Sequence, residues 1–293
     1  WERGSGKMSA LVSQKKALRV CCVQLEPVHG DPAASISRCE TLLLERDMSG
    51  VDVLLLPEMA LSGYTFSSRA DLPVDETTTL EWCKAVALRL DCVVACGRPR
   101  TVGGACYNSL MVVRRDGTVA LEYDKQHLYV TDKTWCKEGK GGFLTSDDLI
   151  PGLRIGFGIC MDINPYEFRD ENKFELANFH KRQGTDVLLF ASAWCSNHPE
   201  DPTWAYEREA AMDPRQRQRN TLTAWLSRLE PLVGSTDCYF VCADRVGSED
   251  LQLYGKPPGK QTIFCGSSCV ISLKAPPTLL GALDSTEEAL LIL

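Results

Sequence analysis

The sequence lacks the features of a membrane-spanning or secreted protein. No run in the 293 residues approaches the roughly 18 to 20 consecutive apolar residues that a membrane helix needs. The N-terminus has no apolar segment of the kind that forms the core of a secretory signal peptide. We interpret residues 1–7 as a cloning remnant and Met8 as the natural start of the folded chain. We therefore expect a cytoplasmic protein with no membrane partner.

Metal-binding and phosphate-binding patterns are also missing. The four histidines are isolated, the fourteen cysteines form no Cys-x-x-Cys pair, and no glycine-rich loop resembles a phosphate cradle. Several cysteines lie inside apolar runs, as small buried side chains do in reduced, cytoplasmic proteins. We expect no metal and no cofactor, so any chemistry must come from side chains alone.

Positive charge is scarce. The chain carries 32 Lys and Arg against 39 Asp and Glu, a net charge of −7. This balance argues against a nucleic acid or an anionic membrane as a partner, because such partners select basic surfaces. One basic cluster exists, "RQRQR" at residues 215–219, and a solvated helix face explains it most simply.

The chain alternates short apolar runs with longer amphipathic stretches, and 44% of its residues are hydrophobic. Buried strands are predicted at residues 17–25, 51–58, 92–100, 152–160, 186–194, 238–246 and 267–273. Helices are predicted at residues 31–48, 77–90, 169–183 and 203–233, the first with Asp31 as N-cap and Pro32 in its first turn. Residues 106–125 are predicted as a hairpin turning at Asp116-Gly117. We expect an α/β fold, one domain over residues 8–293, with a sheet covered by helices.

Three polar residues follow apolar strands at the point where each strand ends. Glu58 follows "VLLLP", Lys125 follows "ALEYD", and Cys160 ends "RIGFGI". In α/β folds this edge of the sheet is where ligand sites are built. A thiol, a carboxylate and an ammonium that meet there suffice for nucleophilic catalysis. Taken singly, Cys160 could equally be another buried thiol, Glu58 a helix cap and Lys125 a surface lysine.

The segments that carry these residues resemble a known family. The sequences "LLLPEMALSGYTF" (54–66), "YDKQHLY" (123–129) and "GFGICMDINPYEF" (156–168) are similar, in this order, to the three catalytic blocks of the nitrilase, or carbon-nitrogen hydrolase, superfamily. The resemblance implies a nitrilase-type α-β-β-α sandwich. It also implies that Cys160 is the nucleophile and Glu58 the general base. Lys125 and the backbone N–H of Met161 would then stabilise the oxyanion.

The resemblance extends to substrate. Most of the superfamily has an Arg shortly after the Cys-x-Asp sequence, but here "CMDINPYEF" has none, which would leave Asp162 without a cationic partner. This segment resembles the branch that deamidates N-terminal Asn and Gln of proteins, a reaction that feeds the N-degron pathway. The family's second pocket acid would correspond to Glu138. Asp162, Glu138, Tyr64 and Trp194 are the expected substrate-binding residues, and Asp162 could instead be a turn residue bonded to backbone N–H groups.

Other interpretations stay open at this point. The chain could be another amidase of the superfamily, such as an ω-amidase or a carbamoyl-amine hydrolase acting on small molecules, or a non-catalytic binding module of the same fold. It could be a monomer or a homodimer. The polar segment at residues 195–233 is expected to form one wall of the substrate entrance.

Overall fold

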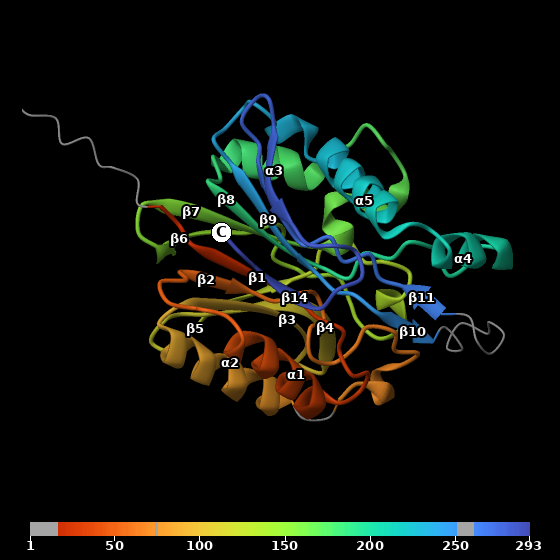
Figure 1. The fold of residues 1–293 in the computed structure, drawn as a ribbon, viewed down its shortest axis with the longest axis horizontal. Coiled ribbons are helices and arrows are strands. Elements are labelled where there is room, and N and C mark those ends of the chain that lie inside the picture. The colour runs from red at the N-terminus through yellow and green to blue at the C-terminus, as the bar shows by residue number, and fades with distance from the viewer. Residues whose placement is uncertain (1–16, 74–75, 251–260) are drawn as a thin grey trace, which may run out of the picture.

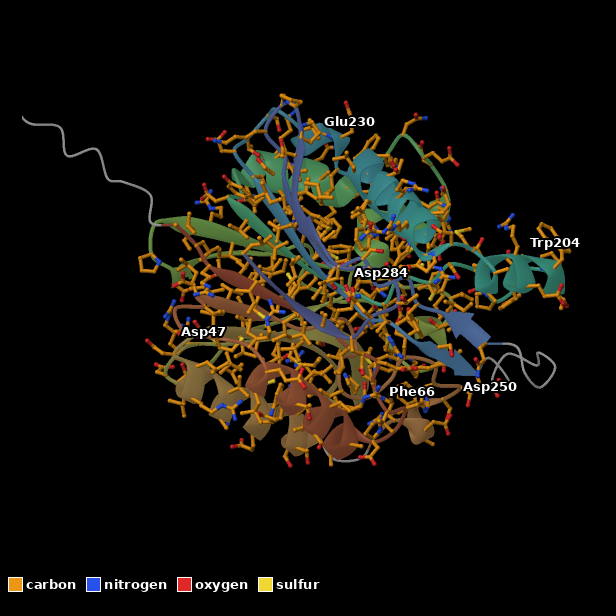
Figure 2. The ribbon with its side chains drawn as sticks, viewed as in Figure 1. Asp47, Phe66, Trp204, Glu230, Asp250 and Asp284 are labelled. Carbon is orange, nitrogen blue, oxygen red and sulfur yellow. The ribbon has the colours of Figure 1, made fainter. Side chains whose placement is uncertain are left out.

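The computed structural model describes residues 17–73, 76–250 and 261–293. The predicted boundary at Met8 lies outside these residues. Two six-stranded sheets face each other, and helices cover the outer face of each. Figure 1 shows the four layers in the order helix, sheet, sheet, helix, and Figure 2 shows side chains filling the space between them. The predicted α-β-β-α sandwich is confirmed.

The first sheet is built mainly from the N-terminal half of the chain, with strand order β14-β1-β2-β3-β4-β5. Its strands are β1 (Val20–Gln24), β2 (Val53–Leu55), β3 (Val93–Val102), β4 (Ala105–Val113), β5 (Val119–Asp124) and β14 (Ala289–Ile292). Helices α1 (Pro32–Leu44) and α2 (Glu76–Leu90) cover its outer face. As predicted, the Asp31 side chain caps α1, accepting a hydrogen bond from the Ala34 N–H.

The second sheet has the order β13-β12-β9-β8-β7-β6. Its strands are β6 (Thr145–Ile150), β7 (Leu153–Ile159), β8 (Val187–Ser192), β9 (Tyr239–Asp244), β12 (Cys269–Ser272) and β13 (Thr278–Ala282). Helices α3 (Glu175–Gln183) and α5 (Pro214–Arg228) cover it. Helix α4 (Thr203–Ala210) and the pair β10 (Ser248–Asp250) and β11 (Gln261–Ile263) lie together at one end of the molecule. Short 3-10 turns span Arg69–Asp71, Asp132–Thr134, Cys160–Ile163, Tyr166–Phe168 and Glu230–Leu232.

The apolar core has three main layers. The layer between the sheets includes Leu55, Phe157 and Leu189, and two further layers lie between each sheet and its helices. All fourteen cysteines are free, and thirteen of them are buried. Most of them, apart from Cys160 and Cys195, act as small side chains that fill the core.

The structure differs from the prediction in its helices and in five of its strands. The stretch predicted as one helix at residues 203–233 is divided into α4 and α5, because Asp213 caps a new helix and Pro214 fits only its first turn. Helix α3 begins at Glu175, six residues later than predicted from 169. Strands β6, β10, β11, β13 and β14 were not predicted. No helix within the described ranges is long and apolar enough to cross a membrane.

Candidate active site

The fold brings the three strand-end residues together at one edge of the sandwich. Glu58 follows β2, Lys125 follows β5, and Cys160 follows β7, so two come from the first sheet and one from the second. Glu58 and Lys125 are fully buried and Cys160 is 7% exposed. The charges of Glu58 and Lys125 both act on the pKa of the Cys160 thiol. The juxtaposition expected from the sequence is therefore present.

Lys125 holds a closed network of polar side chains. Its Nζ donates to Glu58 Oε1 and to Asp132 Oδ2, each at 2.6 Å. Asn108, on β4, donates its Nδ2 to the same two carboxylates, at 2.7 Å to Glu58 Oε1 and 3.0 Å to Asp132 Oδ1. The second oxygen of Glu58 accepts from the Ala193 N–H at 2.9 Å. An ammonium has three donors, so one N–H of Lys125 is left for a substrate.

Asp132 is a site residue that the sequence analysis missed. It is fully buried, whereas Glu138, the predicted second acid, is exposed and accepts a hydrogen bond from the Tyr166 hydroxyl at 2.8 Å. This corrects the prediction that Glu138 lies in the site. The neighbouring residues do not distinguish the two acids, because Asp132 is followed by Lys133 and Glu138 is preceded by Lys137.

Two left-handed residues shape the turns that present the site. Cys160 has φ of 41°, and Met59, directly after Glu58, has φ of 51°. Side chains other than glycine rarely adopt this region, which costs on the order of 1–3 kcal/mol per residue. A sharp turn at Cys160 lets the sulfur leave the strand and lie at a cavity wall. The same turn geometry positions nucleophiles in other hydrolase folds.

Gly97, on β3, permits the Glu58 turn to lie directly against the sheet. A Cβ atom at this position would lie 2.4 Å from Pro57 O and 2.6 Å from the Glu58 Cα. The two backbones are hydrogen-bonded in both directions, from Gly97 N to Pro57 O and from Ala60 N to Gly97 O. A glycine inside a strand often marks such a close approach. Gly97 therefore sets how closely the backbone of Glu58, the general-base candidate, packs against β3.

Burial and charge set the protonation states at rest. Burial, and then the neighbouring carboxylate of Glu58, raise the pKa of the Cys160 thiol well above its ordinary value. Burial also raises the pKa of Glu58, against the opposing effect of Lys125. Burial acts to lower the pKa of Lys125, but the carboxylates of Asp132 and Glu58 hold it well above its ordinary value. The resting site thus holds a neutral thiol beside an ammonium that stays charged.

Cys160 opens into a cavity of about 260 Å³, here called the Cys160 cavity. Its wall consists of Tyr129, Cys160, Met161, Asn164, Phe168, Ala193, Trp194, Cys195, Ser196, Asn197, His198 and Asp201. The segment at residues 195–233, which we expected to form one wall of the substrate entrance, contributes its residues between Cys195 and Asp201 to this wall. Of the predicted substrate-binding residues, Trp194 is in this wall. Tyr64 is not; it is fully buried, and its ring centroid lies 5.8 Å from Lys125 Nζ.

Asp162 is not available to a substrate. Its carboxylate is fully buried and accepts from the Tyr123 hydroxyl at 2.7 Å. It also accepts from the N–H groups of Gln126, His127 and Ile159, at 3.0, 2.8 and 2.9 Å. These four donors fill its acceptor sites. Asp162 therefore has the other role that the sequence left open, which is to fasten the Cys160 turn to the segment after Lys125.

Asp201 is the acidic residue in the wall of the Cys160 cavity. Its Oδ2 accepts from the His198 N–H at 2.8 Å, and within residues 17–73, 76–250 and 261–293 no Lys or Arg pairs with it. Among the residues that the structure describes, the cavity wall contains no Lys or Arg. No signal in the sequence distinguishes Asp201 from the other acids of its polar segment. Within the described ranges, no group of three His, Cys, Asp or Glu side chains could hold a metal ion.

Comparisons with known proteins identify the family to which this fold belongs. The carbon-nitrogen hydrolase family model matches residues 19–212. The chain is 30% identical to the protein N-terminal amidase of Schizosaccharomyces pombe, over 92% of this chain and 97% of that protein.

Two crystal structures of an N-terminal amidase, one with an Asn-Glu-Ala peptide and one with a Gln-Gly peptide, superpose with TM-scores of 0.74 and 0.75. They are 19% and 20% identical and cover 94% of this chain and 97% and 96% of theirs, which shows a shared fold. The family model and the fission-yeast relative together establish that the chain belongs to the carbon-nitrogen hydrolase family.

Proposed function

We propose that this hydrolase removes ammonia from the side-chain carboxamide of N-terminal Asn and Gln in polypeptides, leaving Asp and Glu. The observation that carries the proposal is the Cys160 cavity, which places a thiol and an unpaired carboxylate, Asp201, in one small space. The name of the fission-yeast relative and the peptides bound to the solved N-terminal amidases support the same substrate class.

The first half of the reaction is acylation of the sulfur. Glu58 takes the Cys160 proton as the thiolate attacks the carboxamide carbon. The remaining N–H of Lys125 and the Met161 N–H stabilise the oxyanion that forms. The C–N bond then breaks, Glu58 returns the proton to the leaving nitrogen, and ammonia departs from a thioester on Cys160.

The second half is hydrolysis of that thioester. Glu58, again a carboxylate, removes a proton from a water molecule that attacks the acyl carbon. The carbon–sulfur bond breaks, the sulfur recovers its proton, and the product leaves with a new carboxylate. Asn108 and Asp132 keep Lys125 and Glu58 in place through both halves.

Asp201 supplies the anion that an N-terminal substrate needs. Such a substrate carries an α-ammonium close to the carboxamide, and Asp201 is the acid that shares the cavity wall with Cys160. A cavity of about 260 Å³ is smaller than the roughly 300–1,000 Å³ of sites for drug-sized ligands. It suits a single residue, with the rest of the polypeptide outside.

The ω-amidase alternative is less well supported. A small substrate with a free carboxylate calls for a cation in the cavity, and the described part of the Cys160 cavity wall contains no Lys or Arg. The cytoplasmic location and the role in the N-degron pathway stay predictions.

The test is ammonia release from three substrates at equal concentration: Asn-Gly-Ala peptide, its N-acetylated form, and free glutamine. We expect turnover of the free peptide, at least about 100-fold slower turnover of the acetylated peptide, and none of glutamine. Equal turnover of the acetylated peptide would overturn the N-terminal specificity. Cys160→Ala and Glu58→Gln should each abolish ammonia release while circular dichroism stays unchanged, and Cys195→Ala, in the same cavity wall, is the matched thiol control.

A further inference from the structure

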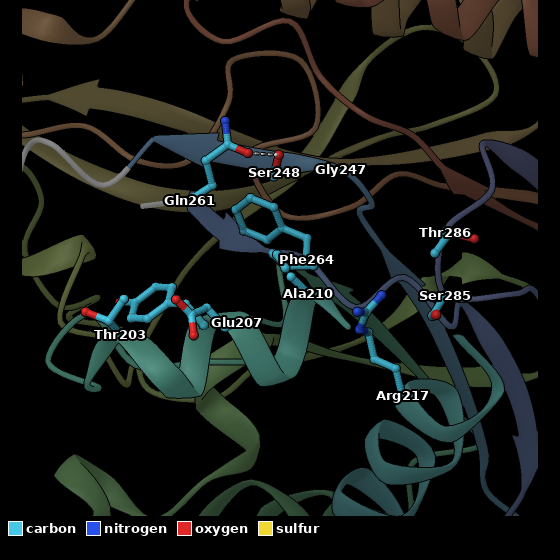
Figure 3. A pocket seen from close by; sticks show the side chains of 12 residues that line it. Thr203, Glu207, Ala210, Arg217, Gly247, Ser248, Gln261, Phe264, Ser285 and Thr286 are labelled. Carbon is cyan, nitrogen blue, oxygen red and sulfur yellow. Dashed lines mark hydrogen bonds between the residues drawn. The ribbon is translucent and has the colours of Figure 1, made fainter. Parts of the chain in front are cut away.

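A second, larger cavity lies away from Cys160. It has a volume of about 510 Å³ and is bounded by α4, the first turn of α5, β10, β11 and the segment around Ser285. None of its lining residues belongs to the wall of the Cys160 cavity. Figure 3 shows it from close by, with Phe264 between Glu207 on one side and Arg217 on the other. We call it the Arg217 cavity.

Arg217 departs from the solvated helix face that the sequence predicted for "RQRQR". Arg215 and Arg219 are exposed, but Arg217, the middle arginine, is only 6% exposed and lines the cavity. Residues two apart lie on different sides of a helix, so the cluster divides into one buried and two solvated cations.

The buried guanidinium has fewer partners than its chemistry calls for. Its Nη2 donates to the Glu209 carbonyl oxygen, and its Nε is buried with no hydrogen-bond acceptor. Within the described residues no carboxylate forms an ion pair with it. Guanidinium carries five donors and stays charged, and a buried charge without a counter-charge is costly.

The remaining wall adds apolar surface to the cation. Ser285 and Thr286 line the cavity with Arg217, but their hydroxyls already donate, to Pro214 O at 2.9 Å and to Asp284 Oδ1 at 2.8 Å. The guanidinium is therefore the cationic donor of this wall. Ala210 and Ile263 supply solvent-accessible apolar surface, whereas Phe264 is only 1% exposed. Cation and apolar surface together match a ligand with an anionic head and an apolar body.

We propose that the Arg217 cavity is a binding site for a small organic anion, with a carboxylate or phosphate head on Arg217 and an apolar body against Ile263. This site is separate from the hydrolytic site and does not depend on its substrate. The sequence singled out no residue of it except the arginine cluster.

The test is isothermal titration calorimetry of the full chain with three probes that each carry one phenyl ring: phenyl phosphate, benzoate and benzyl alcohol. We expect saturable binding of at least one anion with a Kd of about 1 mM or below, and binding of the neutral alcohol at least about tenfold weaker. The tighter anion identifies the head group. No saturable binding, or equal binding of benzyl alcohol, would overturn the site.

Variants on the same helix locate the binding. Arg217→Gln should weaken the tighter anion at least about tenfold, and Arg219→Gln, the exposed control, should leave its Kd unchanged. If Arg217→Gln does not fold, Ala210→Trp fills the cavity from α4 without removing the guanidinium, and it should abolish binding in a folded protein. Undiminished binding to a folded Arg217→Gln or Ala210→Trp variant would refute the assignment.

Discussion

The two sheets make different contributions to the hydrolytic site. The first supplies its charges: Glu58, Lys125 and Asp132, joined by Asn108, form a buried and hydrogen-bonded set. The second supplies the sulfur and, from the segment after β8, the cavity residues Trp194 to Asp201. The Ala193 N–H, which follows β8 of the second sheet, donates a hydrogen bond to Glu58 and so joins the two sides.

This division separates chemistry from specificity. The charge network is closed, so a change in any member leaves another buried group without a partner. The cavity wall is partly open and mostly apolar, and the side chains from Trp194 to Asp201 can change without disturbing the network. Changes on the first side should therefore reduce kcat and stability together, and changes between Trp194 and Asp201 should act mainly on KM.

The strongest test of the division is Lys125→Met. It leaves Glu58 and Asp132 buried without their cation, which we expect to destabilise the fold by about 3–5 kcal/mol and to lower kcat by about 10³-fold. Urea denaturation and steady-state ammonia release measure the two effects. Lys133→Met, at an exposed lysine that pairs with Glu167, should change neither. Normal kcat in Lys125→Met would contradict the network's role.

The second prediction concerns the pH dependence of stability in the second sheet, where α3 packs against β7, the strand that ends at the nucleophile. His180, on α3, is fully buried and bonds to Phe157 O on β7 at 3.2 Å and to Thr185 Oγ1 at 3.0 Å. Burial lowers its pKa from 6.5 to about 4. As the pH falls, His180 is therefore protonated in the unfolded chain before it is protonated in the folded protein. The stability that the neutral, buried His180 contributes is complete above pH 6.5 and is lost as the pH falls towards 4.

The expected loss is about 3 kcal/mol between pH 7 and pH 4, at about 1.4 kcal/mol per pKa unit. Carboxylates titrate in the same range, so the measurement is the difference in unfolding free energy between wild type and His180→Gln across that interval. The variant should have the shallower pH dependence. Identical slopes would show that His180 does not titrate as proposed.

The third prediction returns to the first sheet. Gly97→Ala places a Cβ against Pro57 O and the Glu58 Cα, which must shift the general base. We expect kcat to fall about 10²-fold, with KM little changed because no residue of the cavity wall moves. Gly141→Ala, where a Cβ would meet nothing within 4 Å, is the control. A normal kcat with a folded Gly97→Ala protein would show that the height of Glu58 is not critical.

How far the sequence predicted this arrangement depends on the range of the interactions. Strand ends at Glu58, Lys125 and Cys160 were visible because apolar runs and the residues that stop them are local. The division between α4 and α5 was missed, although Asp213-Pro214, a cap followed by a first-turn proline, is a local signal for it.

Long-range contacts were not readable. The choice between Asp132 and Glu138 depends on which side chain the chain buries against Lys125. The four donors around Asp162 come from two separate segments, residues 123–127 and Ile159, so its lack of a nearby Arg did not leave it free. Asp201 becomes distinct from its acidic neighbours only when the fold places it in the wall that holds Cys160.

The mildest predicted effect tests the specificity side of the comparison. Asp201→Asn keeps the shape of the wall and removes the charge that the substrate α-ammonium would meet. We expect KM for N-terminal Asn and Gln peptides to rise about tenfold to thirtyfold, which corresponds to about 1.4–2 kcal/mol, with kcat within about threefold of wild type. The N-acetylated peptide, which has no ammonium, should be equally poor with both proteins. A fall in kcat instead would place Asp201 in the chemical step, and the separation of chemistry from specificity between the two sheets would not hold.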